Sequence, residues 1–407
     1  MLWWVLVGTV VVATLIVAVV FGRRRTSSEQ QRAASSSASS SSKKATTQNN
    51  SNTKGKGKGK GKLSNVAIRL KTKDTTKNHP LFVQRLKVHT APVTDLCFNP
   101  KGKYLASIGA DRTIYLFHTD TLSDSNTRSQ RINTEFDHGE ACCFSPDGYH
   151  LLLVMATTKQ VRIYGLKKEK GTDKVKAEVV KEFPTKHADE VRTIRMAHNN
   201  KYILTCSEED TKVSLWSLQG KELETLDTKK MRNYMASLSP NNLFTVASFT
   251  ADVPIWEVET KKGKEWEFNG TRKVMDLSNG HRGSVYAVCF SADGKLLATA
   301  SKDCTLRIWD VNVRWHQQED PKPVHKISLE EPVQRLAFTP DNKVIAATSG
   351  PSLLLFSVES GELLDKVATA HENGSAIAAL SWSADSLYLA TAADSTIKVW
   401  KNPLLVS

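Results

Sequence analysis

The chain has 407 residues, of which 40% are hydrophobic and 7% aromatic, so it can build a sizeable core and is not a wholly disordered chain, a collagen or a multi-span membrane protein. The net charge of +14 sits almost entirely in residues 22–79, where fifteen Lys and Arg residues face two acidic ones, a local charge of +13. The rest of the chain is nearly neutral, so the basic character belongs to a tail and does not indicate a nucleic-acid-binding fold.

The first segment predicts a membrane anchor. Residues 2–21 carry no charged side chain, and thirteen of them are Leu, Ile, Val or Phe, which is the length needed to cross about 30 Å of hydrocarbon as a helix. Trp3 and Trp4 stand where an interfacial belt would lie, and the arginines at 23–25 follow the stretch, which places the later residues in the cytosol. The alternative, a cleaved signal peptide, requires a shorter apolar stretch, a preceding basic residue and a small-residue cleavage site. We therefore expect residues 1–22 to form a single transmembrane anchor.

Residues 23–78 predict a disordered linker, because they are rich in Ser, Lys and Gly and hold too few apolar residues to bury a core. Its basic side chains could contact the phosphates of anionic lipids or of RNA. The residues proposed for these contacts are Arg23, Arg24, Arg25, Lys54, Lys56, Lys58, Lys60 and Lys62. A solubilising spacer is the other interpretation, and the sequence leaves both open.

From residue 79 to residue 407, seven segments repeat one pattern of alternating strand, turn, small-residue strand and apolar strand that ends on an aromatic residue. The turns begin at Asn99, Ser145, His198, Ser239, Ser291, Thr339 and Ser383, and the closing aromatic residues are Phe117, Tyr164, Trp216, Trp256, Trp309, Phe356 and Trp400. Their mean spacing of about 47 residues is close to the roughly 40 to 45 residues of a four-stranded propeller blade. The pattern predicts an all-β, seven-bladed propeller.

The fifth segment, residues 281–310, resembles the WD40, or Trp-Asp, repeat family. In that family a His, a Ser or Thr, an Asp and a Trp form a buried hydrogen-bonded chain in each blade. The resemblance assigns these structural tetrads to His281, Thr299, Asp303 and Trp309, to His371, Thr391, Asp394 and Trp400, and to His187, Thr205, Asp210 and Trp216. Blade one offers His89, Ser107 and Asp111 but ends in Phe117, and blades two, four and six lack most of the set.

Ring closure needs one more strand, because the chain stops seven residues after Trp400, too soon for a fourth strand in blade seven. An open ring would expose sheet edges. Residues 81–87 alternate in a strand-like manner just before the first blade, so we expect them to supply the outer strand of blade seven.

The sequence contains no complete catalytic, cofactor-binding or metal-binding motif. The Gly-Lys run lacks the Ser or Thr of a phosphate-binding loop, His371-Glu372 has no second His, and the six cysteines lack metal-ligand spacing, so they are interpreted as buried thiols. We expect no enzyme, no cofactor, no metal and no small-molecule substrate. The proposed partner-binding residues are Arg112, Glu209 and Lys302, beside the tetrad turns, and Trp315, which could instead pack its own loop onto the blade.

Within the WD40 family, the order of anchor, linker and blades is similar to that of a membrane-anchored member, and the likeness is carried by residues 102–114, 136–147, 183–187 and 252–263. This resemblance implies a single-pass protein of the endoplasmic reticulum membrane whose cytosolic propeller is a scaffold. The implied partners are the ER-stress kinase PERK and the ribosome, with a role in the unfolded protein response and translational control. The alternative is an RNA or ribosome tether in which residues 43–77 provide the affinity.

Overall fold

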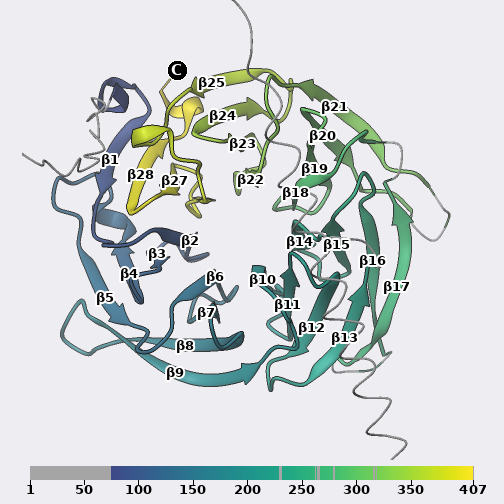
Figure 1. Cartoon of the computed structure of the whole chain (residues 1–407), viewed down its shortest axis with the longest axis horizontal. Coiled ribbons are helices and arrows are strands. Elements are labelled where there is room, and N and C mark those ends of the chain that lie inside the picture. The colour runs from purple at the N-terminus through teal and green to yellow at the C-terminus, as the bar shows by residue number, and fades with distance from the viewer. Residues whose placement is uncertain are drawn as a thin grey trace, which may run out of the picture. The chain divides into compact units, whose positions relative to one another are not determined.

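The fold is a ring of seven four-stranded antiparallel sheets, the blades, which confirms the expected propeller (Figure 1). The computed structural model describes residues 75–406 except 229–231, 262, 264, 265, 278, 279, 315, 316 and 318. The anchor expected at residues 1–22 and the linker up to residue 74 lie outside the described residues. No helix in the described part is both long and apolar enough to cross a membrane.

Each of blades one to six uses four consecutive strands, ordered from the ring axis outwards. Blades one to three are β2 (Val93–Phe98), β3 (Tyr104–Gly109), β4 (Thr113–His118) and β5 (Ser129–Asn133); β6 (Gly139–Phe144), β7 (His150–Met155), β8 (Gln160–Lys168) and β9 (Val175–Pro184); and β10 (Val191–Met196), β11 (Tyr202–Ser207), β12 (Lys212–Ser217) and β13 (Glu222–Asp227). Blades four to six are β14 (Met235–Leu238), β15 (Phe244–Ser248), β16 (Pro254–Thr260) and β17 (Phe268–Asp276); β18 (Val285–Phe290), β19 (Leu296–Ser301), β20 (Thr305–Asp310) and β21 (Lys322–Ser328); and β22 (Arg335–Phe338), β23 (Val344–Ser349), β24 (Ser352–Ser357) and β25 (Leu363–Val367).

Blade seven joins the two ends of the propeller. It contains β26 (Ala379–Trp382), β27 (Tyr388–Ala393) and β28 (Thr396–Lys401), and its outer strand is β1 (Phe82–Leu86), which pairs with β28 in the register Phe82 to Trp400 and Leu86 to Ile397. This is the position expected for residues 81–87. Figure 1 shows β1 beside β28 at the closing point of the ring. No sheet edge is therefore left open between the first and last blades.

The folded part begins earlier than the expected boundary at residue 79. The 3₁₀ helix η1 (Thr75–Asn78) precedes β1, and the side chain of Thr76 is buried against blade seven. The sequence analysis assigned residues 75–78 to the linker because they are polar. The three other short 3₁₀ helices with described bounds are η2 (Thr119–Thr121), η4 (Glu372–Gly374) and η5 (Pro403–Leu405).

The turns between first and second strands require the left-handed backbone region. Gly148 has a φ of 70° in the turn that begins at Ser145, and Asn242 has a φ of 62° in the turn that begins at Ser239. Gly and Asn adopt this region at the lowest cost, which is why the turns carry them. In both turns the first serine hydroxyl donates to an Asp or Asn two residues later, and that side chain accepts a backbone N–H in return.

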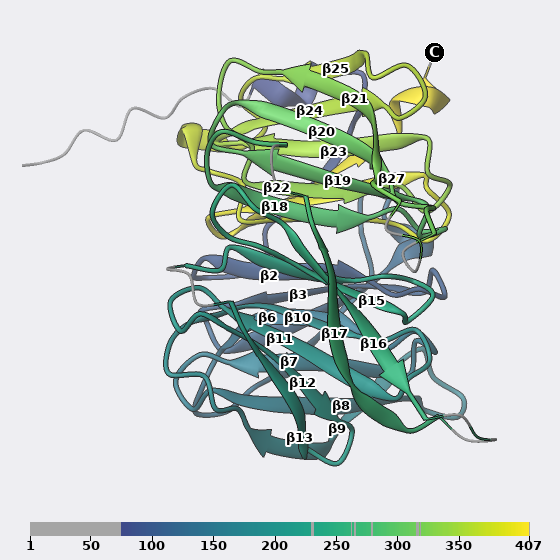
Figure 2. The same cartoon turned by 90° about the vertical axis from the view of Figure 1, so that its right-hand side faces the viewer.

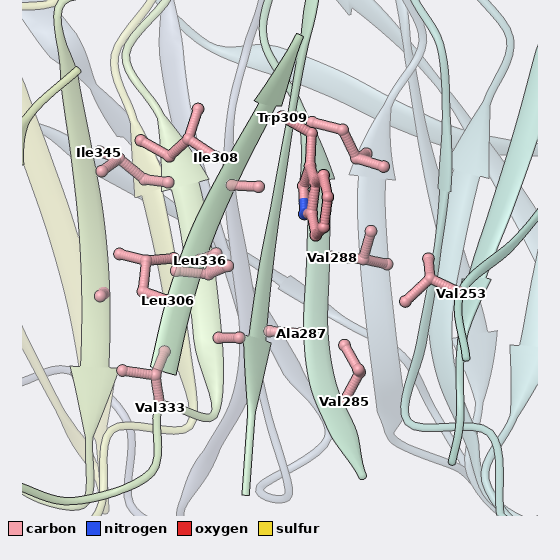
Figure 3. Close-up of a cluster of buried hydrophobic side chains, with 14 of the residues drawn as sticks. Val253, Val285, Ala287, Val288, Leu306, Ile308, Trp309, Val333, Leu336 and Ile345 are labelled. Atoms are coloured by element: carbon pink, nitrogen blue, oxygen red, sulfur yellow. The ribbon is translucent and has the colours of Figure 1, made fainter. Parts of the chain in front are cut away.

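The core lies between the blades, because each strand of the ring presents alternate side chains to two neighbours. In β20, Leu306 and Ile308 face blade six, whereas Trp309 points the other way, toward Val288 and blade four (Figure 3). All seven closing aromatic residues are buried on the third strands of their blades. Burial of each such side chain stabilises the fold by about 1.5 to 3 kcal/mol, so the cohesion of the ring comes from packing between the blades. Figure 2 shows the ring of blades from the side.

Candidate functional site

One face of the propeller is built from hydrogen-bonded turns. We define the loop face as the turns between the second and third strands of each blade, together with the segments that lead into the first strands. Lys302 N, in the blade-five turn, donates to the carbonyl of Ser284 at 2.8 Å, in the segment entering its own blade, and Leu329 N, on the way to blade six, donates to the carbonyl of Cys304 at 2.8 Å. Similar bonds recur from blade to blade, so the exposed residues of these turns are held in fixed positions.

Blade five shows how buried side chains hold a turn of the loop face in place. Trp309 Nε1 donates to Thr299 Oγ1 at 2.9 Å, Thr299 Oγ1 lies 2.8 Å from His281 Nε2, and His281 Nδ1 lies 3.3 Å from Asp303 Oδ2. The carboxylate of Asp303 also accepts from the backbone N–H of Arg282 at 2.8 Å. The chain runs from the buried third strand to the exposed turn, and it satisfies polar groups that would each cost about 1 to 3 kcal/mol if left unpaired.

The electrostatics of blade five keep its histidine neutral and its aspartate charged. Burial lowers the pKa of His281, and the nearby Asp303 carboxylate only partly opposes this. Burial alone would raise the pKa of Asp303, but hydrogen bonds from Thr305 and from the backbone of Arg282 outweigh it and lower that pKa to about 2. The arrangement needs a neutral imidazole that donates from Nδ1 and accepts at Nε2, which suits a structural bridge.

Blades three and one place their residues in the same way. His187 lies 2.6 Å from the Asp210 carboxylate and 2.8 Å from Thr205, which accepts from Trp216 Nε1 at 2.8 Å. In blade one, His89 lies 3.1 Å from Asp111 and 2.8 Å from Ser107. The closing residue there is Phe117, which has no donor, so the chain of bonds starts at the serine.

Blade seven brings three of its four assigned residues into one chain. Trp400 Nε1 donates to Thr391 Oγ1 at 2.9 Å, and Thr391 Oγ1 lies 2.8 Å from His371 Nε2. Asp394 has a left-handed φ of 47°, and its carboxylate accepts from Ser375 Oγ at 2.5 Å. The spacing of one residue fewer before Asp394 explains its different orientation within the turn.

Blade two reverses the geometry, which the sequence analysis missed. Asp137, in the segment that enters the blade, is buried, and its carboxylate accepts from the backbone N–H groups of Thr157 and Thr158 at 3.0 and 2.9 Å. Burial would raise the pKa of Asp137, but these hydrogen bonds lower it. In blade two the acid therefore lies in the entering segment and contacts the turn, whereas in blades one, three and five it lies in the turn. The signal for this contact in the sequence is the segment Phe136-Asp137-His138.

The three described partner-binding candidates all lie on the loop face. Arg112, Glu209 and Lys302 are exposed and sit in the turns of blades one, three and five, and Arg112 has a φ of 61°. Glu209 also forms an ion pair of 3.1 Å with Arg232. The structure therefore groups them on one face but on alternate blades, without bringing them into one patch. Trp315 lies outside the described residues, as do the eight basic residues proposed for phosphate contacts.

Among the described residues of the loop face, Phe136 is the most exposed large apolar side chain, and its role was not predicted from the sequence. It is 91% exposed, whereas Thr134 and Asp137 on either side are 2% and 5% exposed. Thr134 Oγ1 donates to the carbonyl of Asp137 at 2.6 Å, and Thr134 N donates to the carbonyl of Arg112 at 3.0 Å. Glu135, between them, has a φ of 62°. A rigid turn therefore holds Phe136 out into solvent, next to the turn of Arg112.

The described residues contain no cluster of three or more His, Cys, Asp or Glu side chains arranged to hold a metal ion. All six cysteines are free thiols; Cys142, Cys143 and Cys206 are buried and the other three are partly exposed. Burial raises the pKa of Cys143 to about 12, so this thiol is protonated near neutral pH.

Comparison with known proteins agrees with the repeat. The WD domain, G-beta repeat family matches residues 81–118, 178–217, 272–310 and 364–401. Each match begins in the outer strand of one blade and ends in the third strand of the next, as β1 and β4 do for the first. Transducin beta-like protein 2 of mouse is 32% identical over 336 residues, which is 82% of this chain and 75% of that protein, and the human protein is 33% identical over 80% and 72%. Small ribosomal subunit protein RACK1 of Neurospora crassa is 28% identical over 34% of this chain and 43% of that protein.

Proposed function

This chain belongs to the WD40-repeat family, and from that premise we propose that it is a membrane-tethered scaffold whose loop face binds a protein partner in the cytosol. The observation that carries the proposal is Phe136, held 91% exposed on a turn whose two flanking residues are buried. A preorganised aromatic side chain loses little conformational freedom on binding, and such residues anchor many protein interfaces.

The tether is supported by the sequence. The uncharged residues 2–21 have the length of a membrane-spanning helix, and the arginines at 23–25 favour a cytosolic propeller. By resemblance, the membrane is that of the endoplasmic reticulum and the partner is the kinase PERK, which would link the scaffold to the unfolded protein response. An exposed binding surface fits a function in which the propeller brings proteins together, and such a function requires no bound cofactor.

Binding of the full chain, reconstituted in lipid nanodiscs, to the purified cytosolic domain of PERK tests this proposal. Phe136→Ala should weaken the complex at least tenfold, because the aromatic anchor is lost. Val324→Ala is the matched control, since Val324 is also exposed, at 44%, but lies on the outer strand β21. Equal affinity of the wild type and Phe136→Ala would reject the loop face as the binding surface, and no measurable complex would reject PERK as the partner.

The second candidate is an RNA or ribosome tether, favoured by the local charge of +13 over residues 22–79. A linker that neutralises six to ten phosphates should lose about 10³- to 10⁵-fold in affinity between 50 and 200 mM salt, whereas a propeller interface should change modestly. Deletion of residues 26–74 tests it and spares Thr76, which the fold uses. RNA or ribosome binding that survives this deletion would reject the linker as its source.

A further inference from the structure

A charged channel runs along the ring axis between the inner strands. Two cavities, of about 380 and 220 Å³, lie along this axis. They share the lining residues Asp95, Arg195, Met235, Leu336 and Leu380, so they adjoin each other along the axis. Arg335 also lines the smaller cavity, and in Figure 1 the strands β2, β10 and β22, which carry Asp95, Arg195 and Arg335, stand around the axis. We call the part of the channel between Asp95, Arg195 and Arg335 the channel waist.

The charges at the mouth of the channel, on the loop face, are matched. Arg192 forms ion pairs of 2.8 Å with Glu190 and 2.7 Å with Glu208. Glu140 lies 3.5 Å from Lys159 Nζ and accepts a hydrogen bond of 3.0 Å from Val191 N. Three carboxyl groups, those of Glu140, Glu190 and Glu208, face the two cations Arg192 and Lys159, so neither of these cations at the mouth is left without a partner.

The charges at the channel waist are not matched. Arg335 Nε donates to the carbonyl of Ala378 at 3.0 Å, and Arg195 Nη1 donates to the carbonyl of Ile194 at 2.8 Å. A guanidinium has five N–H donors, so most of the donors of both arginines have no hydrogen-bond partner within the described part of the chain. Both side chains remain partly accessible to solvent.

Asp95 does not neutralise this pair. Its carboxylate accepts hydrogen bonds from the backbone N–H groups of Leu96 and Cys142, at 2.8 and 2.9 Å. Among the described residues, no ion pair within 4.0 Å joins Asp95 to Arg195 or Arg335. Burial lowers the pKa of Arg335, Asp95 opposes this, and the positive charges of Arg192 and Arg195 add to it. The positive charges of Arg195 and Arg335 therefore disfavour each other, and arginine keeps its charge near neutral pH.

We propose that the channel waist binds a phosphate group, free or carried by a small phosphate monoester, through the guanidinium groups of Arg195 and Arg335. Two planar forks with free N–H donors match the oxygens of a phosphate, and an anion relieves the repulsion between them. The cavity of about 220 Å³ that both arginines line is also lined by Arg192 and by the carboxyl groups of Asp95, Glu140 and Glu190, and it is large enough for a group of this size. This inference does not rest on the proposed scaffold function, because the loop-face turns and the channel waist use different residues.

Equilibrium dialysis of the full chain with radiolabelled inorganic phosphate, at constant ionic strength set with chloride, tests the proposal. We expect saturable binding of one phosphate per chain, weakened about tenfold or more by Arg335→Gln and by Arg195→Gln. Arg128→Gln is the matched control, because Arg128 is an exposed arginine paired with Asp120 and Asp173 on the outside of blade one, and it should leave the affinity unchanged. Competition by glycerol phosphate shows whether a monoester is bound as well as the free ion.

A variant that is expected to strengthen phosphate binding keeps the test decisive if Arg335→Gln misfolds. Asp95→Asn removes the carboxylate of the channel waist while retaining one side-chain oxygen, so it should tighten phosphate binding several-fold. No saturable binding, equal affinity in Arg195→Gln, or equal weakening in Arg128→Gln would overturn the proposal. Tighter binding of acetate than of phosphate would also overturn it, because the site would then select carboxylates.

Discussion

The side-chain nitrogen Nζ of Lys398 donates a hydrogen bond of 2.6 Å to Oγ1 of Thr76, although 322 positions separate the two residues. Lys398, in the last strand of the propeller, is 0% exposed, and Thr76 is 5% exposed. A buried ammonium group is costly unless its donors are satisfied. The contact therefore fastens the beginning of the folded chain to its end, alongside the pairing of β1 with β28.

Thr76→Val should destabilise the propeller by about 1 to 3 kcal/mol, because it removes a hydrogen-bond acceptor from a buried charge while keeping the side-chain volume. Thr172→Val, at an exposed position, is the control and should change stability by less than about 0.5 kcal/mol. Urea unfolding of the two variants measures the difference. Equal stability of both would show that the hydroxyl of Thr76 contributes nothing to ring closure.

Deletion of residues 79–88 should abolish cooperative unfolding, because it removes β1 and leaves the edge of β28 exposed. Differential scanning calorimetry checks this, with deletion of residues 43–62 as a control that leaves the folded part intact. A near-unchanged thermal transition after the first deletion would contradict the role given to β1.

Thr299→Val should destabilise the fold by about 1 to 3 kcal/mol, because Trp309 and His281 both lose their bond to this hydroxyl. Blade six supplies the matched control. Thr348 is equally buried, at 0% exposure, but its hydroxyl has no hydrogen-bond partner among the described residues, so Thr348→Val should be neutral or stabilising. Urea unfolding should separate the two substitutions, and equal effects would show that the hydrogen-bonded chain adds no stability.

The free energy of unfolding should depend on pH through the titration of Glu140. Burial raises its pKa from 4.5 to about 7, against the hydrogen bond from Val191 N and the charge of Lys159. A raised folded-state pKa favours folding fully below the unfolded value, and this contribution is lost as the pH rises through about 7. Glu140→Gln should therefore be more stable than the wild type by about 1 to 3 kcal/mol near pH 8 and about equally stable near pH 5. The free energy of unfolding at the two pH values checks this; a difference that does not change with pH would contradict it.

Glu135→Gly should stabilise the propeller by about 0.5 to 1 kcal/mol, because glycine adopts a φ of 62° without the steric cost that a glutamate bears. If the strained turn serves to hold Phe136, the same change should weaken binding to the PERK cytosolic domain while raising the melting temperature. Stronger binding together with higher stability would argue against a preorganised anchor.

The sequence predicted the fold well because each blade repeats a turn and an aromatic residue at nearly constant spacing. Trp309 and Trp216 are buried as expected, because each stands at the end of an apolar strand whose side chains pack between blades. The start of the folded part was placed too late because Thr76 is polar, and its role depends on Lys398, which no local pattern connects to it.

The candidate site was harder to predict than the fold. Arg112, Glu209 and Lys302 lie on turns that the repeat defines, so their place could be predicted, whereas Phe136 and Asp137 lie in a segment that departs from the repeat. The unmatched charges of Arg195 and Arg335 escaped notice for another reason: they come from blades three and six, and only the closed ring brings them to one channel.

The topology of the full chain in microsomes tests the central claim, a membrane-tethered scaffold with a cytosolic propeller, most directly. The chain carries three acceptor sequences for N-glycosylation, at Asn49, Asn269 and Asn373. Asn269 lies exposed in β17, where a luminal enzyme could reach it. The account predicts a membrane-integrated chain that is unglycosylated and whose propeller is digested by added protease. A glycosylated, protease-protected propeller would contradict it.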